Sequence, residues 1–161
     1  KIGKKSETID GIKFGMVQSG GTPALHSFYG AQNVLDATPS YFLSVAGDRN
    51  NHPSLSLKFG DSLFLGKNIE VRSFADENEL HSEKHVPRKL RVWFQAGPDS
   101  AEEVAIEEFQ MNQDGNGMSN LPAKPFNQIR IEMTEQSRGG GWYLRLGRVS
   151  ITGTFIADSI N

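Results

Sequence analysis

The chain has 161 residues, of which 37% are hydrophobic and 22% are charged, and its formal net charge is −2. These values are typical of a globular domain that is large enough to bury a core, and they exclude a disordered chain. The slightly negative charge disfavours a nucleic-acid binder, which needs a basic face for phosphates, and the apolar runs are far too short to span a membrane. Because cysteine is absent, disulfides and thiolate metal sites are excluded.

The sequence begins with Lys1 and not with Met, and no signal-peptide pattern follows. We therefore expect the chain to be part of a longer, multidomain protein. Residues 1–9, KIGKKSETI, are polar and basic, which predicts a lead-in without stable structure. No internal repeat or linker divides the remainder, so we expect a single domain over residues 10–157.

Apolar residues alternate with polar ones along much of the chain, which is the period-two pattern of strands with one buried face. The clearest case is Leu90, Val92 and Phe94, which places Trp93 on the opposite face. The stretches with this pattern are residues 12–16, 54–59, 69–72, 90–95, 129–133 and 144–153. Polar turns separate them, so we predict an all-β protein, an antiparallel β-sandwich or jelly roll of about eight strands.

Three segments carry motifs in a familiar order. Residues 31–36, AQNVLD, followed by Ser40, Phe42 and Ser44, match the pattern A-x-N-x-x-D…T-x-W-x-S in part. Residues 87–94, PRKLRVWF, with the turn at 97–100 and Val104, match a strand that ends in S-x-D-G-x-x-W. Residues 126–153 match a closing hairpin in which R-Y-V-R-L precedes a Gly-rich loop with Trp and then L-A-E-I-x-x-x-G.

On these motifs the chain resembles the discoidin, or coagulation factor 5/8 type C, group of galactose-binding-like domains, which includes many family 32 carbohydrate-binding modules. The resemblance covers most of residues 12–155. It implies an eight-stranded antiparallel jelly roll that binds ligands with the loops at one end. One departure is that Phe42 stands where the family has Trp.

The resemblance also implies, for many members, a structural calcium ion held by the Asp of the first motif, nearby carbonyls and a Glu of the closing strand. Asp36 stands at the Asp position, but Arg148 stands where the Glu is expected. Calcium prefers hard oxygen ligands and negative charge. An arginine supplies neither, and its guanidinium can instead pair with Asp36. We therefore predict no calcium ion and no other cofactor.

Sugar recognition needs an aromatic face for the C–H side of the ring and a few planar polar groups for the hydroxyls. Trp142 and Tyr143 follow three glycines, which permit close approach of a ligand. The alternative is that Trp142 closes the end of the core and the glycines only form a turn. The ligand-binding candidates are Trp142, Tyr143 and Arg138 in one loop, Asp76, His81 and His85 in a second, and Arg49, Asn51 and His52 in a third.

His81 and His85 are four residues apart, a spacing that brings two ligands to one metal ion only on a helix. Pro87 and the charged composition of residues 75–87 argue against a helix there, so we expect no metal site. A solvated charged loop explains these residues as well as a sugar contact does.

The resemblance implies a carbohydrate-binding module. The sequence itself disfavours an enzyme, because it contains no nucleophile elbow such as G-x-S-x-G and no phosphate-binding loop. The alternative is a protein-interaction domain on the same fold, with a contact surface around Trp93 or the acidic residues 99–108. A buried Trp142 with an exposed Trp93 would favour this alternative. We expect an extracellular or cell-surface protein, although a cytoplasmic one fits the composition too.

Overall fold

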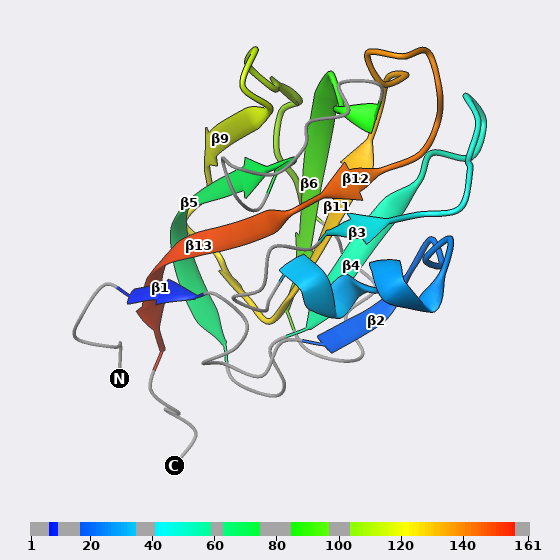
Figure 1. Cartoon of the computed structure of the whole chain (residues 1–161). Coiled ribbons are helices and arrows are strands. Elements are labelled where there is room, and N and C mark those ends of the chain that lie inside the picture. The colour runs from blue at the N-terminus through cyan, green and yellow to red at the C-terminus, as the bar shows by residue number, and fades with distance from the viewer. Residues whose placement is uncertain are drawn as a thin grey trace.

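Two antiparallel sheets face each other in the computed structural model, which describes residues 7–9, 17–34, 41–58, 63–74, 85–96 and 104–156 (Figure 1). In the first sheet the strand order is β1 (Glu7–Ile9), β13 (Arg148–Phe155), β5 (Phe64–Arg72) and β10 (Pro125–Phe126), and β9 (Asn116–Asn120) also pairs with β5. In the second it is β2 (Val17–Gly21), β4 (Ser54–Lys58), β11 (Gln128–Met133), β6 (Lys89–Gln95) and β7 (Val104–Ala105), and β8 (Phe109–Gln110) also pairs with β6.

A separate two-stranded ladder joins β3 (Phe42–Leu43) to β12 (Arg145–Leu146), and two short 3-10 helices, η1 (Ser27–Tyr29) and η2 (Ala31–Val34), precede β3. Five of the strands in the described residues have two residues each; the eight longer ones are β1, β2, β4, β5, β6, β9, β11 and β13. The predicted all-β antiparallel sandwich is confirmed. No helix among the described residues is long and apolar enough to cross a membrane.

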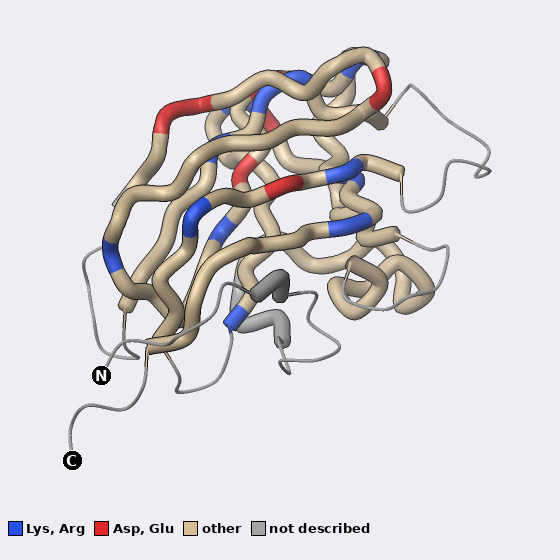
Figure 2. The backbone as a smooth tube through the Cα atoms, turned by 90° about the vertical axis from the view of Figure 1, so that its left-hand side faces the viewer, with Lys and Arg blue, Asp and Glu red and all other residues tan. Residues whose placement is uncertain are grey.

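The core lies between the two sheets and follows the alternation in the sequence. In β6 the side chains of Leu90, Val92 and Phe94 are buried, whereas Trp93 and its polar neighbours are half-buried on the outer face. Phe94 meets Phe126 of the opposite sheet at 5.2 Å between ring centroids. Alternating strands therefore bury one set of side chains from each sheet, as the hydrophobic effect requires. Lys and Arg are mixed with Asp and Glu over the chain (Figure 2).

Strand β5 is longer than the sequence predicted, since it begins at Phe64 and not at residue 69. Its buried face includes Gly66, where an added Cβ would lie 2.6 Å from a methyl carbon of Leu121. Because a glycine stands at a core-facing position, the apolar alternation is interrupted and the first half of the strand is hidden in the sequence.

Two further predictions concern the first 16 residues of the chain. Residues 7–9, which we assigned to the lead-in, form β1 and pair with β13 in the register Glu7 to Gly153. Backbone hydrogen bonding along an exposed edge makes this strand, and it needs no apolar pattern of its own. The strand predicted at residues 12–16 lies outside the described residues.

Candidate functional site

The β3–β12 ladder continues into two loops and sets the place of Trp142. The backbone N–H of Ser44 donates to the carbonyl of Leu144 (3.0 Å), and that of Gly47 donates to the carbonyl of Trp142 (2.9 Å). The loops of residues 47–53 and 134–144 therefore lie side by side at one end of the sandwich, which we call the loop end (Figure 1).

The glycine run before Trp142 forms a closed turn. Ser137 N donates to the carbonyl of Gly141 and Gly140 N donates to the carbonyl of Ser137, both at 2.9 Å. Gly140 has φ +83°, in the left-handed region that glycine adopts without a steric penalty. Gly140 therefore lets the loop reverse tightly, and Trp142 follows directly on an extended segment.

Trp142 is half-buried and packs against the hydrophobic core. Its indole ring also stacks on the imidazole of His52, with 5.3 Å between the ring centroids and an interplanar angle of 7°. The structure thus brings together two of the predicted site residues from loops that are far apart in the sequence. The ring contacts the core and keeps part of its surface in solvent.

A partly buried carboxylate holds His52 in this position. Nδ1 of His52 lies 2.7 Å from Oε2 of Glu132, and the two side chains are 27% and 13% exposed. Oε1 of Glu132 accepts a hydrogen bond of 2.7 Å from the indole Nε1–H of Trp93. An ionised carboxylate only accepts hydrogen bonds, so the proton of this contact resides on Nδ1. In the neutral ring, Nε2 is then an acceptor.

The surroundings of Glu132 favour its charged form. Burial by itself would raise the pKa of Glu132, but hydrogen bonds from Trp93 and His52 and the positive charges of Arg130 and His52 outweigh burial. The net result is a pKa below the usual value of 4.5. Glu132 is therefore an anion at neutral pH, as the contact with His52 requires.

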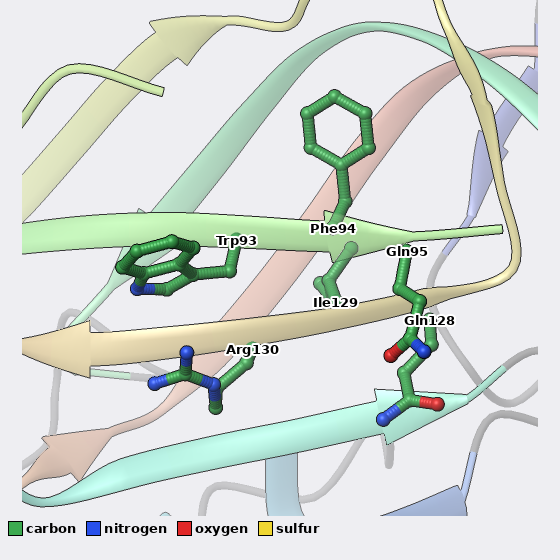
Figure 3. A pocket seen from close by; sticks show the side chains of 6 residues that line it. All are labelled: Trp93, Phe94, Gln95, Gln128, Ile129 and Arg130. Atoms are coloured by element: carbon green, nitrogen blue, oxygen red, sulfur yellow. The ribbon is translucent and has the colours of Figure 1, made fainter. Parts of the chain in front are cut away.

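Trp93 extends this network along the outer face of the second sheet (Figure 3). The guanidinium of Arg130 lies 5.0 Å from the centre of the Trp93 ring, and that of Arg91 lies 5.9 Å from it. Figure 3 shows the amides of Gln95 and Gln128 next to each other farther along the same face. The hollow between these side chains is shallow, about 50 Å³. Trp93 and Trp142 are both half-buried. The combination that would favour a protein-interaction domain, a buried Trp142 with an exposed Trp93, is therefore not found.

A second cluster surrounds Tyr143. Consecutive side chains of an extended segment point to opposite sides, and Tyr143 meets His85 edge to face at 5.5 Å between ring centroids. The backbone N–H of Arg138 donates to the carbonyl of Val86 (3.0 Å). The guanidinium of Arg138 donates to the carbonyls of Gln113 (3.0 Å) and Asn112. His85, Arg138 and Tyr143 thus lie together at the loop end.

The third predicted loop presents polar side chains to solvent. Asp48 and Asn51 exchange backbone hydrogen bonds of 3.0 and 3.1 Å, and the carboxylate of Asp48 accepts from the N–H of Asn50 at 2.8 Å. This turn leaves Arg49 and Asn51 exposed immediately before His52. Two remaining candidates, Asp76 and His81, lie outside the described residues.

Of the two residues weighed for calcium, Asp36 lies outside the described residues and Arg148 opens β13, opposite Arg72. The described residues contain no cluster of three or more metal-ligating side chains.

Arg145 of β12 is a buried cation, only 3% exposed. Its guanidinium lies 3.8 Å from the ring centre of Tyr41 and 4.8 Å from that of Phe74. This cation is stabilised by two aromatic faces.

Glu132 is the site residue that sequence reasoning missed. It alternates with apolar neighbours in β11 and therefore reads as an ordinary solvent-facing residue. The available signal was its register: Glu132 faces Ser54 on β4, two residues after His52. That pairing is not visible before the strands are aligned.

No protein-family model matches the sequence, and a search of curated proteins finds no significant match. Solved structures do match. The family 32 module of NanJ from Clostridium perfringens, in complex with galactose, superposes with a TM-score of 0.69 at 13% identity, over 92% of this chain and 99% of that one. A family 32 module from a family 31 glycoside hydrolase of the same organism gives a TM-score of 0.70 at 12% identity, over 91% and 94% of the two chains.

A two-module structure of ZmpB from Clostridium perfringens, in complex with GalNAc, matches with a TM-score of 0.65 at 7% identity, over 86% of this chain and 33% of that one. At such low identities the likeness concerns the fold. The resemblance inferred from the motifs is thereby confirmed at this level: the chain has the discoidin-like β-sandwich fold of family 32 carbohydrate-binding modules.

Proposed function

We propose that this domain is a non-catalytic carbohydrate-binding module that holds a sugar at the loop end. The observation that carries the proposal is the half-buried Trp142, whose ring stacks on His52, which Glu132 holds in place. An indole face suits the C–H side of a pyranose ring. A ring nitrogen that accepts hydrogen bonds suits a sugar hydroxyl.

The neighbouring side chains supply the polar groups that a sugar needs. Arg49 and Asn51 are exposed immediately before His52, and guanidinium and amide groups both bind pairs of hydroxyls in a fixed geometry. Asp76 and His81 remain candidates from the sequence alone, since they lie outside the described residues. Because solved neighbours with this fold carry galactose or GalNAc, we choose these sugars as the first probes.

The same reasoning extends to the biological setting. Neighbours with this fold belong to glycoside hydrolases and other multidomain chains. We infer that this domain belongs to a larger extracellular or cell-surface protein and directs it to a glycan. Neither catalysis nor a bound metal ion is needed for this role.

The test is calorimetric titration of the protein with methyl β-galactopyranoside and with GalNAc. We expect binding in the millimolar-to-micromolar range, and Trp142→Ala should weaken it about tenfold or more, equivalent to about 1.4 kcal/mol. Phe28→Ala is the matched control, because Phe28 is an aromatic residue with 76% exposure in η1. It should bind like the wild type.

Trp142 also contacts the core, so its removal can lower stability. Thermal unfolding of the variant shows whether it is folded at the titration temperature. Asn51→Ala provides a second change, at an exposed residue of the same loop end. Unchanged affinity in both variants would place any sugar site elsewhere. Absence of binding to a broad panel of glycans would contradict the proposed function.

A further inference from the structure

Glu132 connects the outer face of the second sheet to the loop end through paired backbone. The N–H of Met133 donates to the carbonyl of Pro53 at 3.0 Å, so the strand that carries Glu132 is bonded to the residue next to His52. In β6, Trp93 lies diagonally across from Glu132 and reaches the same carboxylate. Strand register therefore holds this carboxylate between a loop residue and a strand residue.

The two oxygens of Glu132 have partners of different kinds. The indole Nε1–H of Trp93 can only donate, and it lies 2.7 Å from Oε1. The guanidinium of Arg130, beside Trp93 in Figure 3, also only donates and lies 3.7 Å from Oε1. His52, at 2.7 Å from Oε2, is different because a neutral imidazole carries its proton on either nitrogen. The carboxylate selects Nδ1 for this proton, since it can only accept.

The other ring nitrogen of His52 is the one that a ligand can reach. The side chain is 27% exposed, and among the residues that the structure describes no group is hydrogen-bonded to Nε2. The imidazole is also nearly parallel to the indole of Trp142, with 5.3 Å between the ring centroids. A sugar that contacts the exposed part of Trp142 therefore has Nε2 as a neighbouring polar atom.

We propose that Glu132, oriented by Trp93, is a positioning residue that presents His52 to the ligand as a hydrogen-bond acceptor. This inference rests on the proposed function and adds a specificity requirement to it. The sugar must turn a hydroxyl toward Nε2 and donate its hydrogen, which a fluorine atom at the same position cannot do. Glu132 acts through His52 and does not itself contact the sugar.

Glu132→Gln should reverse the tautomer of His52, and the reason lies at Trp93. Because the indole only donates, the carbonyl oxygen of the new amide must face Trp93, and the amide NH₂ then faces His52. An NH₂ group only donates, so Nδ1 becomes the acceptor and the proton of the neutral ring moves to Nε2. A substitution that keeps the shape of the side chain thus converts the nitrogen facing the ligand from an acceptor into a donor.

The first measurement is the tautomer of His52 in the free protein. Two-bond ¹H–¹⁵N spectra are recorded at a pH at which the imidazole is neutral, and His52→Asn identifies its signals among the four histidines. The wild type should carry the proton on Nδ1, and Glu132→Gln should carry it on Nε2. Glu70→Gln is the matched control, because Glu70 is a strand residue of the opposite sheet that is paired with Arg72 at 3.4 Å. It should leave the His52 signals unchanged.

The second measurement is calorimetric titration with methyl β-galactopyranoside and with its monodeoxyfluoro analogues, in which fluorine replaces one hydroxyl. In the wild type at least one analogue should bind about three- to tenfold more weakly than the parent sugar, the scale of one hydrogen bond. In Glu132→Gln the penalty for that analogue should fall below about twofold, because the parent hydroxyl now accepts from Nε2–H. A merely loosened His52 would weaken both sugars alike and leave their ratio unchanged.

The outcomes separate this inference from the proposed function. A wild-type proton on Nε2 overturns the inference, and this result does not depend on whether any variant folds. Equal fluorine penalties in the wild type and Glu132→Gln also overturn it, while sugar binding stands. If no sugar binds, the proposed function fails and the spectra alone decide whether Glu132 positions His52. A reversed tautomer in Glu132→Gln then supports the positioning role, and an unchanged tautomer overturns it.

Discussion

Glu132 connects two aromatic residues that are far apart in the sequence. One of its oxygens contacts His52, the partner of Trp142, and the other accepts from Trp93. Because these contacts favour the anion, the pKa of Glu132 is lower in the folded state than its usual value of 4.5. The folded protein then binds fewer protons than the unfolded chain as the pH falls through this region.

The expected consequence is a loss of stability in acid. The contribution of Glu132 is complete above pH 4.5 and is lost as the pH falls below that value toward its lower folded-state pKa. Glu132→Gln should lower the free energy of unfolding at pH 7 by about 1–2 kcal/mol, the scale of a lost charge-assisted hydrogen bond. Urea unfolding at pH 7, 4.5 and 3.5 gives the free energy of unfolding of the wild type and of Glu132→Gln.

The comparison between the two proteins isolates Glu132 from other acids. Glu108 also has a lowered pKa, first because of the Thr134 hydroxyl and against the effect of burial, with Arg91 and Lys89 adding to it. Its contribution is present in both proteins and cancels in the difference. The wild type should lose more stability than Glu132→Gln between pH 7 and 3.5. If the free energy of unfolding falls equally with pH in both proteins, the contact of Glu132 with His52 does not stabilise the fold.

At the scale of secondary-structure elements, β13 and β5 approach each other closely at Gly153. The register between the two strands shifts between Thr152 and Gly153. A Cβ added to Gly153 would lie 2.3 Å from the carbonyl oxygen of Leu65 and 2.6 Å from the ring of Phe64. The irregularity therefore depends on the absence of a side chain.

Gly153→Ala should destabilise the domain by about 1–3 kcal/mol, because the backbone of β5 cannot move away without breaking its ladder. Chemical denaturation gives the value. Gly30→Ala is the control: Gly30 has φ −67°, and the nearest atom to an added Cβ is 3.6 Å away. That change should stay within about 0.5 kcal/mol. Equal stability of both variants would mean that the close approach relaxes easily.

At the scale of the whole molecule, both sheets contribute to one hydrophobic core. The buried side chains of β4, β6 and β11 pack against those of β5 and β13, with no second cluster among the described residues. A domain with one core of this size is expected to unfold cooperatively.

We therefore predict a single unfolding transition. Trp142 and Trp93 report on the loop end and the outer face of one sheet, whereas far-UV circular dichroism reports on strands throughout the molecule. Both signals should give the same midpoint in urea within error. A fluorescence midpoint at lower urea concentration would show that the loop end unfolds separately, and the single-domain interpretation would need revision.

The strands could be predicted because their cause is local. Leu90, Val92 and Phe94 alternate with polar residues, and this order alone requires one buried and one outer face. The same argument placed Trp93 on the outer face of β6. It failed where Gly66 interrupted the pattern of β5, and where β1 formed by backbone pairing without an apolar signature.

By itself, the sequence determined the fold class, the buried faces and the residue types that a sugar site requires, because these follow from neighbours along the chain. Only the tertiary structure decided which of these residues meet. His52 and Glu132 are 80 positions apart, and Ser44 and Leu144 are 100 apart. Contacts over such separations depend on strand register and on the packing of loops. The stack of Trp142 on His52 therefore exists only once both sheets are assembled.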